Sequence, residues 1–142
     1  MKIVIQVVKE ASVSINNEIY NKIDKGYLLL VGIEKDDNEQ VVQNIANRIC
    51  NMRINKDEND KTNLSILDIG GEILSISQFT LAADCSKRRP SFSKAADPVM
   101  AKRLYEYFNE CLKKLNIVVK EGIFGEYMQV SLINDGPFTI II

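Results

Sequence analysis

The chain contains no histidine among its 142 residues. This absence excludes Ser-His-Asp and Cys-His catalysis, and it excludes any metal site built on imidazole. The cysteines Cys50, Cys85 and Cys111 are far apart and form no CxxC pair, so neither a zinc site nor a disulfide framework is expected. Cys50 and Cys111 fall on apolar helical faces, and Cys85 has no histidine to activate its thiol. We therefore expect no metal and no cofactor.

The chain also lacks a large net charge and a long apolar run. Its net charge is −1, so the whole molecule is not an electrostatic nucleic-acid binder, and DNA is not an expected partner. An RNA contact would need a local patch, for which Lys87-Arg88-Arg89 is the candidate and a solvated basic loop the alternative. No apolar run approaches the roughly 20 residues of a membrane span, and Met1-Lys2-Ile3-Val4-Ile5 lacks a signal-peptide layout. These features favour a cytoplasmic protein without a membrane partner.

The length suits one domain, residues 1–142. Two segments carry helix signals. Asp36-Asp37-Asn38 supplies N-caps for a helix that runs to about Met52, and Asp97-Pro98 begins a second helix that ends near Leu115. Alternating or continuous apolar runs predict strands, which we expect at residues 2–8, 12–15, 18–20, 26–33, 72–77, 118–119, 128–133 and 140–142.

The arrangement of these strands indicates the fold class. Asn16-Asn17 is typical of a hairpin turn, and the run from Gly26 to Ile33 is apolar on both faces, as a central strand is. Residues 55–63 form a polar loop whose acidic spacing does not match an EF-hand. Because strands outnumber helices and are partly joined by hairpins, we predict an α/β fold of the α+β type. It has mixed or antiparallel sheets and two main packed helices.

Two apolar runs meet at Asn134-Asp135-Gly136-Pro137-Phe138-Thr139. Pro137 cannot donate to a sheet ladder, so it must sit at an edge, a bulge or a turn. Gly136 can adopt backbone angles that are closed to other residues. On residue chemistry alone the segment is interpreted as a tight turn between two strands, although a Gly-Pro bond can also be cis.

A second motif, Ser77-Gln78-Phe79-Thr80-Leu81, closes the strand that starts at Glu72. Polar groups and an aromatic ring crowd together where a strand ends and a loop begins. Such ends often hold binding groups, because a rigid sheet positions them and the loop leaves them accessible. The alternative is ordinary alternation, with Gln78 and Thr80 exposed and Phe79 buried.

Together these two motifs closely resemble the signature of the D-aminoacyl-tRNA deacylases. The resemblance covers essentially the whole chain, and it continues in Gly70-Gly71-Glu72, in residues 88–92 and in residues 125–132. It implies the deacylase fold and a homodimeric editing enzyme. Such enzymes hydrolyse the ester between a D-amino acid and the 3′ end of tRNA, and they also act on glycine carried by the wrong tRNA.

The resemblance also implies roles for individual residues. Ser77, Gln78, Phe79 and Thr80 would line the reaction centre. A cis Gly136-Pro137 bond would lie in a loop that reaches into the partner's pocket and rejects L-aminoacyl-tRNA. The residues implied in substrate binding and chiral selection are Gly136, Pro137, Met128, Asn134, Phe138 and Thr139.

Catalysis without histidine is chemically reasonable for this substrate. An aminoacyl ester is already reactive, so placement and oxyanion stabilisation matter more than a strong base. Backbone N–H groups around Phe79 and Thr80 are suitable donors. No base is evident that could activate the Thr80 hydroxyl, so we expect Thr80 to position water or substrate, with a nucleophilic Thr80 as the alternative.

The sequence departs from the family pattern at two places. Val7 stands where the family usually has an arginine near the Gly-Pro loop, and the segment Cys85-Ser86-Lys87-Arg88-Arg89 is one residue shorter than is common. Two other functions therefore stay open. One is a non-catalytic homologue that binds a D-amino acid or a nucleotide. The other is an editing enzyme for a different mischarged tRNA, which would suit a trans Gly-Pro bond.

Overall fold

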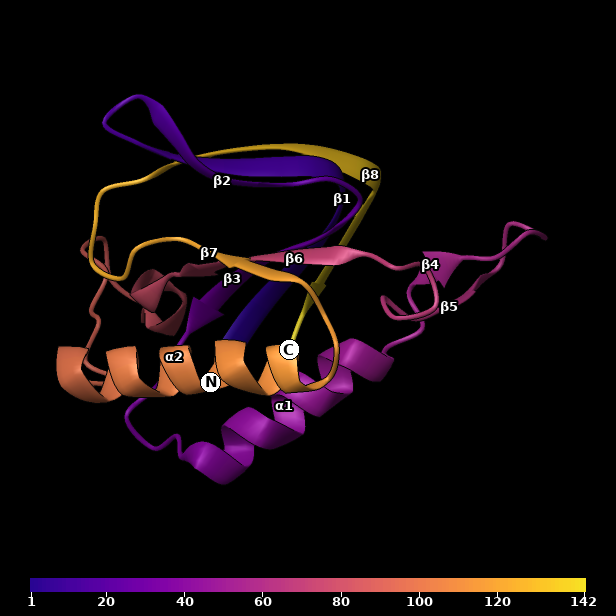
Figure 1. Ribbon diagram of the computed structural model, residues 1–142. Coiled ribbons are helices and arrows are strands. Elements are labelled where there is room, and N and C mark those ends of the chain that lie inside the picture. The colour runs from indigo at the N-terminus through magenta and orange to yellow at the C-terminus, as the bar shows by residue number, and fades with distance from the viewer.

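The computed structural model describes residues 1–142. Figure 1 shows both α-helices on one face of a sheet, and a small hairpin projecting from one side. The elements in chain order are β1 (Lys2–Ile15), β2 (Glu18–Ile23), β3 (Gly26–Gly32), α1 (Glu39–Asn51), β4 (Asn55–Lys56), β5 (Thr62–Leu64), β6 (Glu72–Ser77), η1 (Phe79–Ala82), α2 (Pro98–Lys114), β7 (Val119–Glu121) and β8 (Gln129–Ile141).

The main sheet is mixed, as predicted. Its order is β2-β1-β3-β6-β7, and β8 also pairs with β1. The strand β1 is antiparallel to β2, β3 and β8, whereas β3, β6 and β7 run parallel. The predicted fold class with two main helices is thereby confirmed, and β3 is a central strand.

The strand β1 contributes to two separate hydrophobic cores. Ile3 and Ile5 face the helices, and the larger core there also contains Val7. From Val8 onward the buried positions belong to a second core on the opposite face, to which β2, β8 and the other face of β3 and β6 contribute. The strand therefore changes its buried face between Val7 and Val8, which explains why alternation in the sequence is weak here.

Both helices begin where their capping residues predict. The Asn38 side chain accepts a hydrogen bond from Val41 N at 3.1 Å, and Asp97 Oδ1 accepts from Val99 N and Met100 N. Neither helix, nor any other, is long and apolar enough to cross a membrane. Cys50 is buried and Cys111 half-buried, while Cys85 is exposed.

The C-terminal junction is not a turn between two strands, and that interpretation was wrong. A single strand, β8, runs from Gln129 to Ile141 along β1. Gln6 pairs with Thr139 and Val8 with Asn134, so residues 135–138 bulge out opposite Val7. The bulge accommodates the missing N–H of Pro137 without reversing the chain. The Gly136–Pro137 bond is cis, as the resemblance implies, and Gly136 has a φ of 132°.

The polar segment 55–63 is more ordered than a loop. It forms the short antiparallel pair of β4 and β5, which projects from the body in Figure 1. Asp57 Oδ1 accepts hydrogen bonds from the N–H groups of Asn59 and Lys61, and these bonds hold the pKa of Asp57 below its usual value. Its carboxylate is therefore engaged by the hairpin itself.

Replacement of Gly26 by alanine should destabilise the protein by about 3 kcal/mol, because overpacking a buried backbone contact cannot be relieved locally. A Cβ atom at Gly26 would lie 1.9 Å from the carbonyl oxygen of Glu72 on the neighbouring strand. Urea unfolding measures the effect. The control is Gly70→Asn, since Gly70 has open space around it and a φ of +59° that asparagine tolerates. A similar loss of unfolding free energy in both variants would contradict the role given to the contact between Gly26 and Glu72.

Candidate functional site

A pocket of about 610 Å³ opens at the carboxyl ends of the parallel strands β3 and β6. The end of β6 and the start of η1 form one wall, the first turns of α2 form another, and the segment before β8 forms a third. The lining residues are Ile33, Ile76, Ser77, Gln78, Phe79, Ala96, Pro98, Ala101, Phe124, Gly125, Glu126, Tyr127, Met128 and Val130.

The chain after β6 turns directly into the short helix η1. Gln78 N still donates to Val31 O of β3 at 2.8 Å, and the first bond inside the turn runs from Leu81 N to Gln78 O at 3.2 Å. Between these two, the N–H groups of Phe79 and Thr80 have no acceptor in the chain. Two adjacent N–H donors without a partner in the chain thus lie beside the pocket.

The Thr80 hydroxyl is bound through its oxygen. Gln78 Nε2 donates to Thr80 Oγ1 at 2.6 Å; Gln78 is half-buried and Thr80 is exposed. Because the oxygen already accepts a hydrogen bond, the hydroxyl proton is free to be donated to a ligand or to water. The alternative of ordinary alternation is wrong here: Thr80 is exposed, but Gln78 is half-buried and Phe79, which alternation would bury, is 54% exposed.

The structure brings only part of the predicted site together. Ser77, Gln78, Phe79 and Met128 line the pocket, and Thr80 adjoins it. The Gly136–Pro137 bulge lies opposite Val7, which pairs with Tyr27, and Tyr27 pairs with Ile73 of β6. The bulge is thus three strand spacings, about 14 Å, from β6. Four predicted residues besides Pro137 are likewise absent from the pocket of their own chain: Asn134, Gly136, Phe138 and Thr139.

Residues 85–90, here called the basic loop, carry Lys87, Arg88 and Arg89 at their exposed tip. The loop is closed at its base by Asp84 and Ser91, which exchange two backbone hydrogen bonds of 2.8 and 3.0 Å. It does not line the pocket. Immediately after it, the Phe92 ring packs edge-to-face on Phe79 with 5.1 Å between ring centroids.

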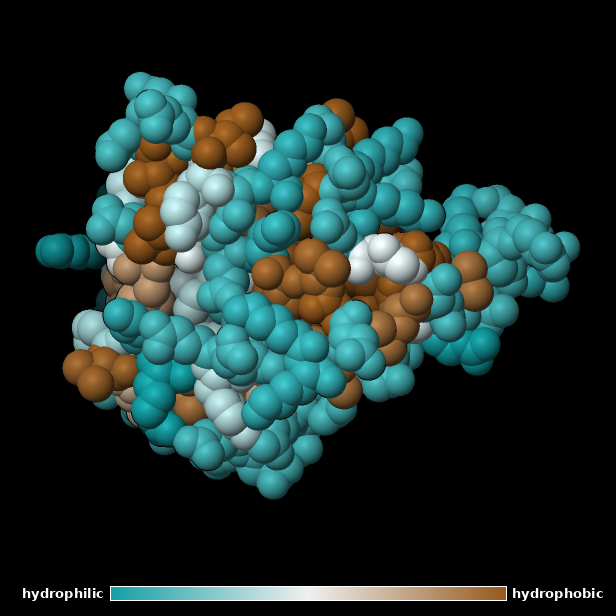
Figure 2. All heavy atoms as spheres, viewed as in Figure 1, coloured by the Kyte–Doolittle hydropathy of each residue, from teal (hydrophilic) through white to brown (hydrophobic).

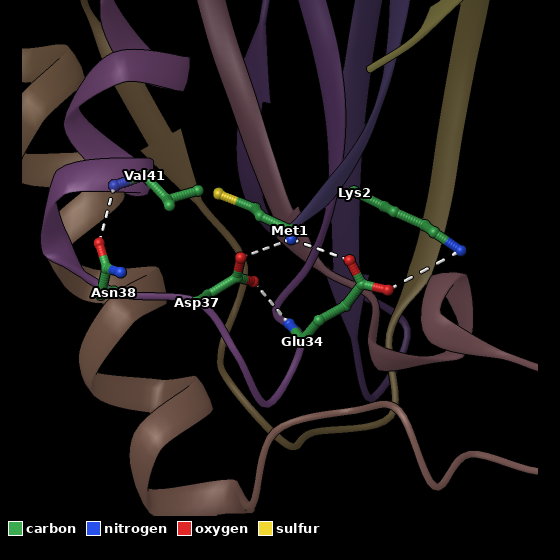
Figure 3. A network of polar contacts seen from close by, with 6 residues as sticks. All are labelled: Met1, Lys2, Glu34, Asp37, Asn38 and Val41. Carbon is green, nitrogen blue, oxygen red and sulfur yellow. Dashed lines mark hydrogen bonds and ion pairs between the residues drawn. The ribbon is translucent and has the colours of Figure 1, made fainter.

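The N-terminal ammonium group binds two carboxylates of the segment that follows β3, as Figure 3 shows. Met1 N lies 2.9 Å from Glu34 Oε2 and 2.6 Å from Asp37 Oδ1. Asp37 Oδ2 also accepts from Glu34 N, so the two carboxylates tie the segment after β3 into one conformation. The hydrogen bond from Met1 N is the main reason that the pKa of Glu34 is lowered.

That segment in turn holds the chain that leads into α2. Lys35 N donates to Lys94 O at 3.1 Å, and Ala96 N donates to Ile33 O at the same distance. Ile33 and Ala96 both line the pocket. The ammonium network therefore supports the pocket without contributing a group to it.

Sequence reasoning missed several lining residues. Glu126 and Tyr127 line the pocket, but in the sequence they fall only within residues 125–132 of the family resemblance. Tyr127 is 87% exposed, which is unusual for an aromatic ring. Pro98 and Ala101 also line the pocket, whereas the sequence pattern predicts for them only a place in the second helix. Their position at the start of α2, after the loop that follows the β6 motif, was the available signal.

Figure 2 shows that hydrophilic side chains dominate the face in view, with separate hydrophobic patches between them.

Comparison with known proteins agrees with this geometry. The family model described as "D-Tyr-tRNA(Tyr) deacylase" matches residues 4–142. The chain belongs to the D-Tyr-tRNA(Tyr) deacylase family. The D-aminoacyl-tRNA deacylases of Thermosipho africanus and Bacillus cytotoxicus are 51% and 53% identical to it over 143 residues. These alignments cover 100% of this chain and 96% and 98% of the relatives. The resemblance seen in the sequence is confirmed, and with it an enzyme of the deacylase class.

Two solved structures share the deacylase fold. One is described as "c-Myc DNA Unwinding Element Binding Protein" and matches with a TM-score of 0.95 at 37% identity, over 100% of this chain and 97% of the other. The second is described as a probable eukaryotic D-amino acid tRNA deacylase. It matches with a TM-score of 0.87 at 14% identity, over 99% and 97% of the two chains, and it supports the fold alone.

Replacing Glu34 by glutamine should make the free energy of unfolding less dependent on pH in the acid range. The pKa of Glu34 is lower in the folded protein than its ordinary value of 4.5. The ionised carboxylate therefore stabilises the fold fully at pH values above 4.5, and this stabilisation is lost as the pH falls through the pKa of the folded protein. Glu34→Gln should cost about 0.5–1 kcal/mol at pH 7 and almost nothing at pH 3. Unfolding at a series of pH values measures this. Glu106→Gln, on an exposed pair, is the control; an equal pH dependence in both variants would contradict the network.

Proposed function

We propose that residues 1–142 act as one deacylase domain that hydrolyses the ester of D-aminoacyl-tRNA and releases a D-amino acid and tRNA. The observation that carries this proposal is the pair of free N–H groups of Phe79 and Thr80 beside a pocket of suitable size. Such donors stabilise the oxyanion that forms when water attacks an ester carbonyl. A tRNA substrate also favours a cytoplasmic location.

The reaction needs no strong base in the protein. Water adds to the ester carbonyl, the negative charge develops on the former carbonyl oxygen, and the two N–H groups stabilise it. The carbonyl then re-forms, the bond between the acyl carbon and the ribose oxygen breaks, and the ribose oxygen leaves with the proton that the attacking water loses. The Thr80 oxygen accepts a hydrogen bond from Gln78, so the Thr80 hydroxyl can donate a hydrogen bond to substrate or water and thereby orient it. One donor in a formed oxyanion hole is worth roughly 2.7–4 kcal/mol.

Selection against L-aminoacyl-tRNA is assigned to the Gly136–Pro137 bulge of a second subunit. The bulge is too far from the pocket of its own chain, and it stands on a strand whose Ile133 and Ile141 are 52% and 73% exposed. Exposed apolar side chains on an edge strand favour a contact with another chain. Backbone atoms at Gly136 and Pro137 would obstruct the L arrangement while ignoring the side chain, so glycine passes. Residues Asn134, Phe138 and Thr139 would shape this loop.

The basic loop is the proposed contact for the tRNA backbone. Lys87, Arg88 and Arg89 form no ion pair with any residue of the chain, so their charges are available to phosphates. The printed name of one structural relative refers to DNA. With a net charge of −1, this chain does not favour duplex DNA as a partner.

A deacylation assay with matched D-tyrosyl-, L-tyrosyl- and glycyl-tRNA tests the function directly. We expect the D-tyrosyl and glycyl esters to be cleaved at least about 100-fold faster than the L-tyrosyl ester, because a backbone obstacle rejects only the L side chain. Release of labelled amino acid is the measurement, and spontaneous hydrolysis without protein is the control. Equal cleavage of the two tyrosyl esters would refute chiral selection, and no cleavage at all would favour the non-catalytic alternative.

Thr80→Ala should lower kcat by about 10-fold to 100-fold and leave clear activity over the background, because the backbone N–H of residue 80 remains. Single-turnover hydrolysis of D-tyrosyl-tRNA measures this. Thr80→Ser, which keeps the hydroxyl, should stay near the original rate. Mass spectrometry of rapidly quenched reactions should find no aminoacyl group on Thr80. A trapped adduct would instead establish a nucleophile, and a complete loss of activity in Thr80→Ala would contradict the residual activity expected of a positioning residue.

A further inference from the structure

We propose that Phe92 is a positioning residue that couples the basic loop to the N–H groups of Phe79 and Thr80. This inference rests on the proposed function and extends it. In this arrangement, contact between the loop and the phosphates of tRNA improves the alignment of the oxyanion donors. The binding of the polymer thereby raises the rate of ester cleavage at its end.

Three hydrogen bonds close the basic loop at its base and tie it to the chain before Phe92. Asp84 and Ser91 exchange both backbone hydrogen bonds, and Asp84 Oδ1 also accepts from Ser86 N at 3.0 Å. This last contact is the main cause of a lowered pKa at Asp84, so its carboxylate stays charged and bound. Residues 85–90 thus move with Ser91, and the next residue in the chain is Phe92.

The contact of Phe92 with Phe79 connects this closed loop to the reaction centre. The rings pack edge-to-face at 65°, and they remain 40% and 54% exposed. An aromatic contact at the surface has a preferred geometry but can adjust when a ligand binds. Phe79 is the first residue of η1, so the ring that Phe92 contacts belongs to one of the two residues whose N–H groups border the pocket, and Thr80 is the other.

The other side of Phe92 is held in place. Ala95 N donates to Phe92 O at 3.0 Å, and Lys94 O accepts from Lys35 N of the segment after β3. The Met1 ammonium network fixes that segment. Phe92 therefore lies between a firm anchor and the unpaired charges of the loop tip.

The test compares two substrates, D-tyrosyl-tRNA and D-tyrosyl-adenosine, which lacks the phosphates. We expect Phe92→Ala to lower kcat on the tRNA by about tenfold, with KM changed less than about twofold, because the donors are misaligned but still present. On D-tyrosyl-adenosine the loss should be no more than about twofold. Phe92→Tyr, which keeps the ring, should restore the tRNA rate. Tyr20→Ala, another half-exposed aromatic residue on the distant strand β2, should leave both rates unchanged.

A double-mutant cycle with Arg88→Ala tests the coupling itself. If the loop acts through Phe92, Arg88→Ala lowers kcat on tRNA in the original protein but not in the Phe92→Ala background, while its effect on KM persists in both. Should Phe92→Ala fail to fold, Phe92→Leu keeps the apolar volume without the ring and replaces it in the same cycle. Additive effects on kcat, or equal losses on both substrates, would overturn the inference. Failure of the unaltered protein to cleave either substrate would overturn the proposed function along with it.

Discussion

The parallel pairing of β3 with β6 is the constraint on which the site depends. Its register runs from Gly26 opposite Glu72 to Val31 opposite Ser77, and the bond from Gln78 N to Val31 O extends it by one step. A slip of one residue would exchange the two faces of β6 and turn Ser77 away from the pocket. The close approach at Gly26 allows only a residue without a Cβ, so one end of the register is fixed by shape.

This register leaves two backbone N–H groups, those of Phe79 and Thr80, available at the pocket. The ladder with β3 ends at Gln78 and the first turn of η1 begins at Leu81, which leaves the two N–H groups between them unpaired. Unpaired N–H groups are costly when buried, but here they border a pocket and can be satisfied by a ligand. A charge that develops on a ligand gains from both donors without any proton transfer from the protein. This arrangement is consistent with a chain that contains no histidine.

The sequence predicted the helices and the central strand, and it singled out the motif at the end of β6 that lines the pocket, because each has a local signal. Asn38 and Asp97 cap helices through bonds within four residues, and the run from Gly26 is apolar on both faces. It did not predict the course of β8. Whether Pro137 reverses a chain or bulges from it depends on the partner strand, and β1, more than 120 residues earlier in the sequence, supplies that partner. The pocket walls at Pro98 and Glu126 were missed for the same reason, since only the tertiary structure brings them to β6.

The separation of the two motifs explains how a backbone site could also sense handedness. One chain carries the unpaired N–H groups of Phe79 and Thr80 at the carboxyl end of β6, and it carries the Gly136–Pro137 bulge on β8, three strands away. If two copies pair about a two-fold axis, each gives its bulge and receives one, so both pockets are completed by a single kind of contact. Val7, which lies under the bulge and is buried in the larger core, would support it by packing. In such a dimer the stability of the interface and the rejection of L-amino acids depend on the same few residues.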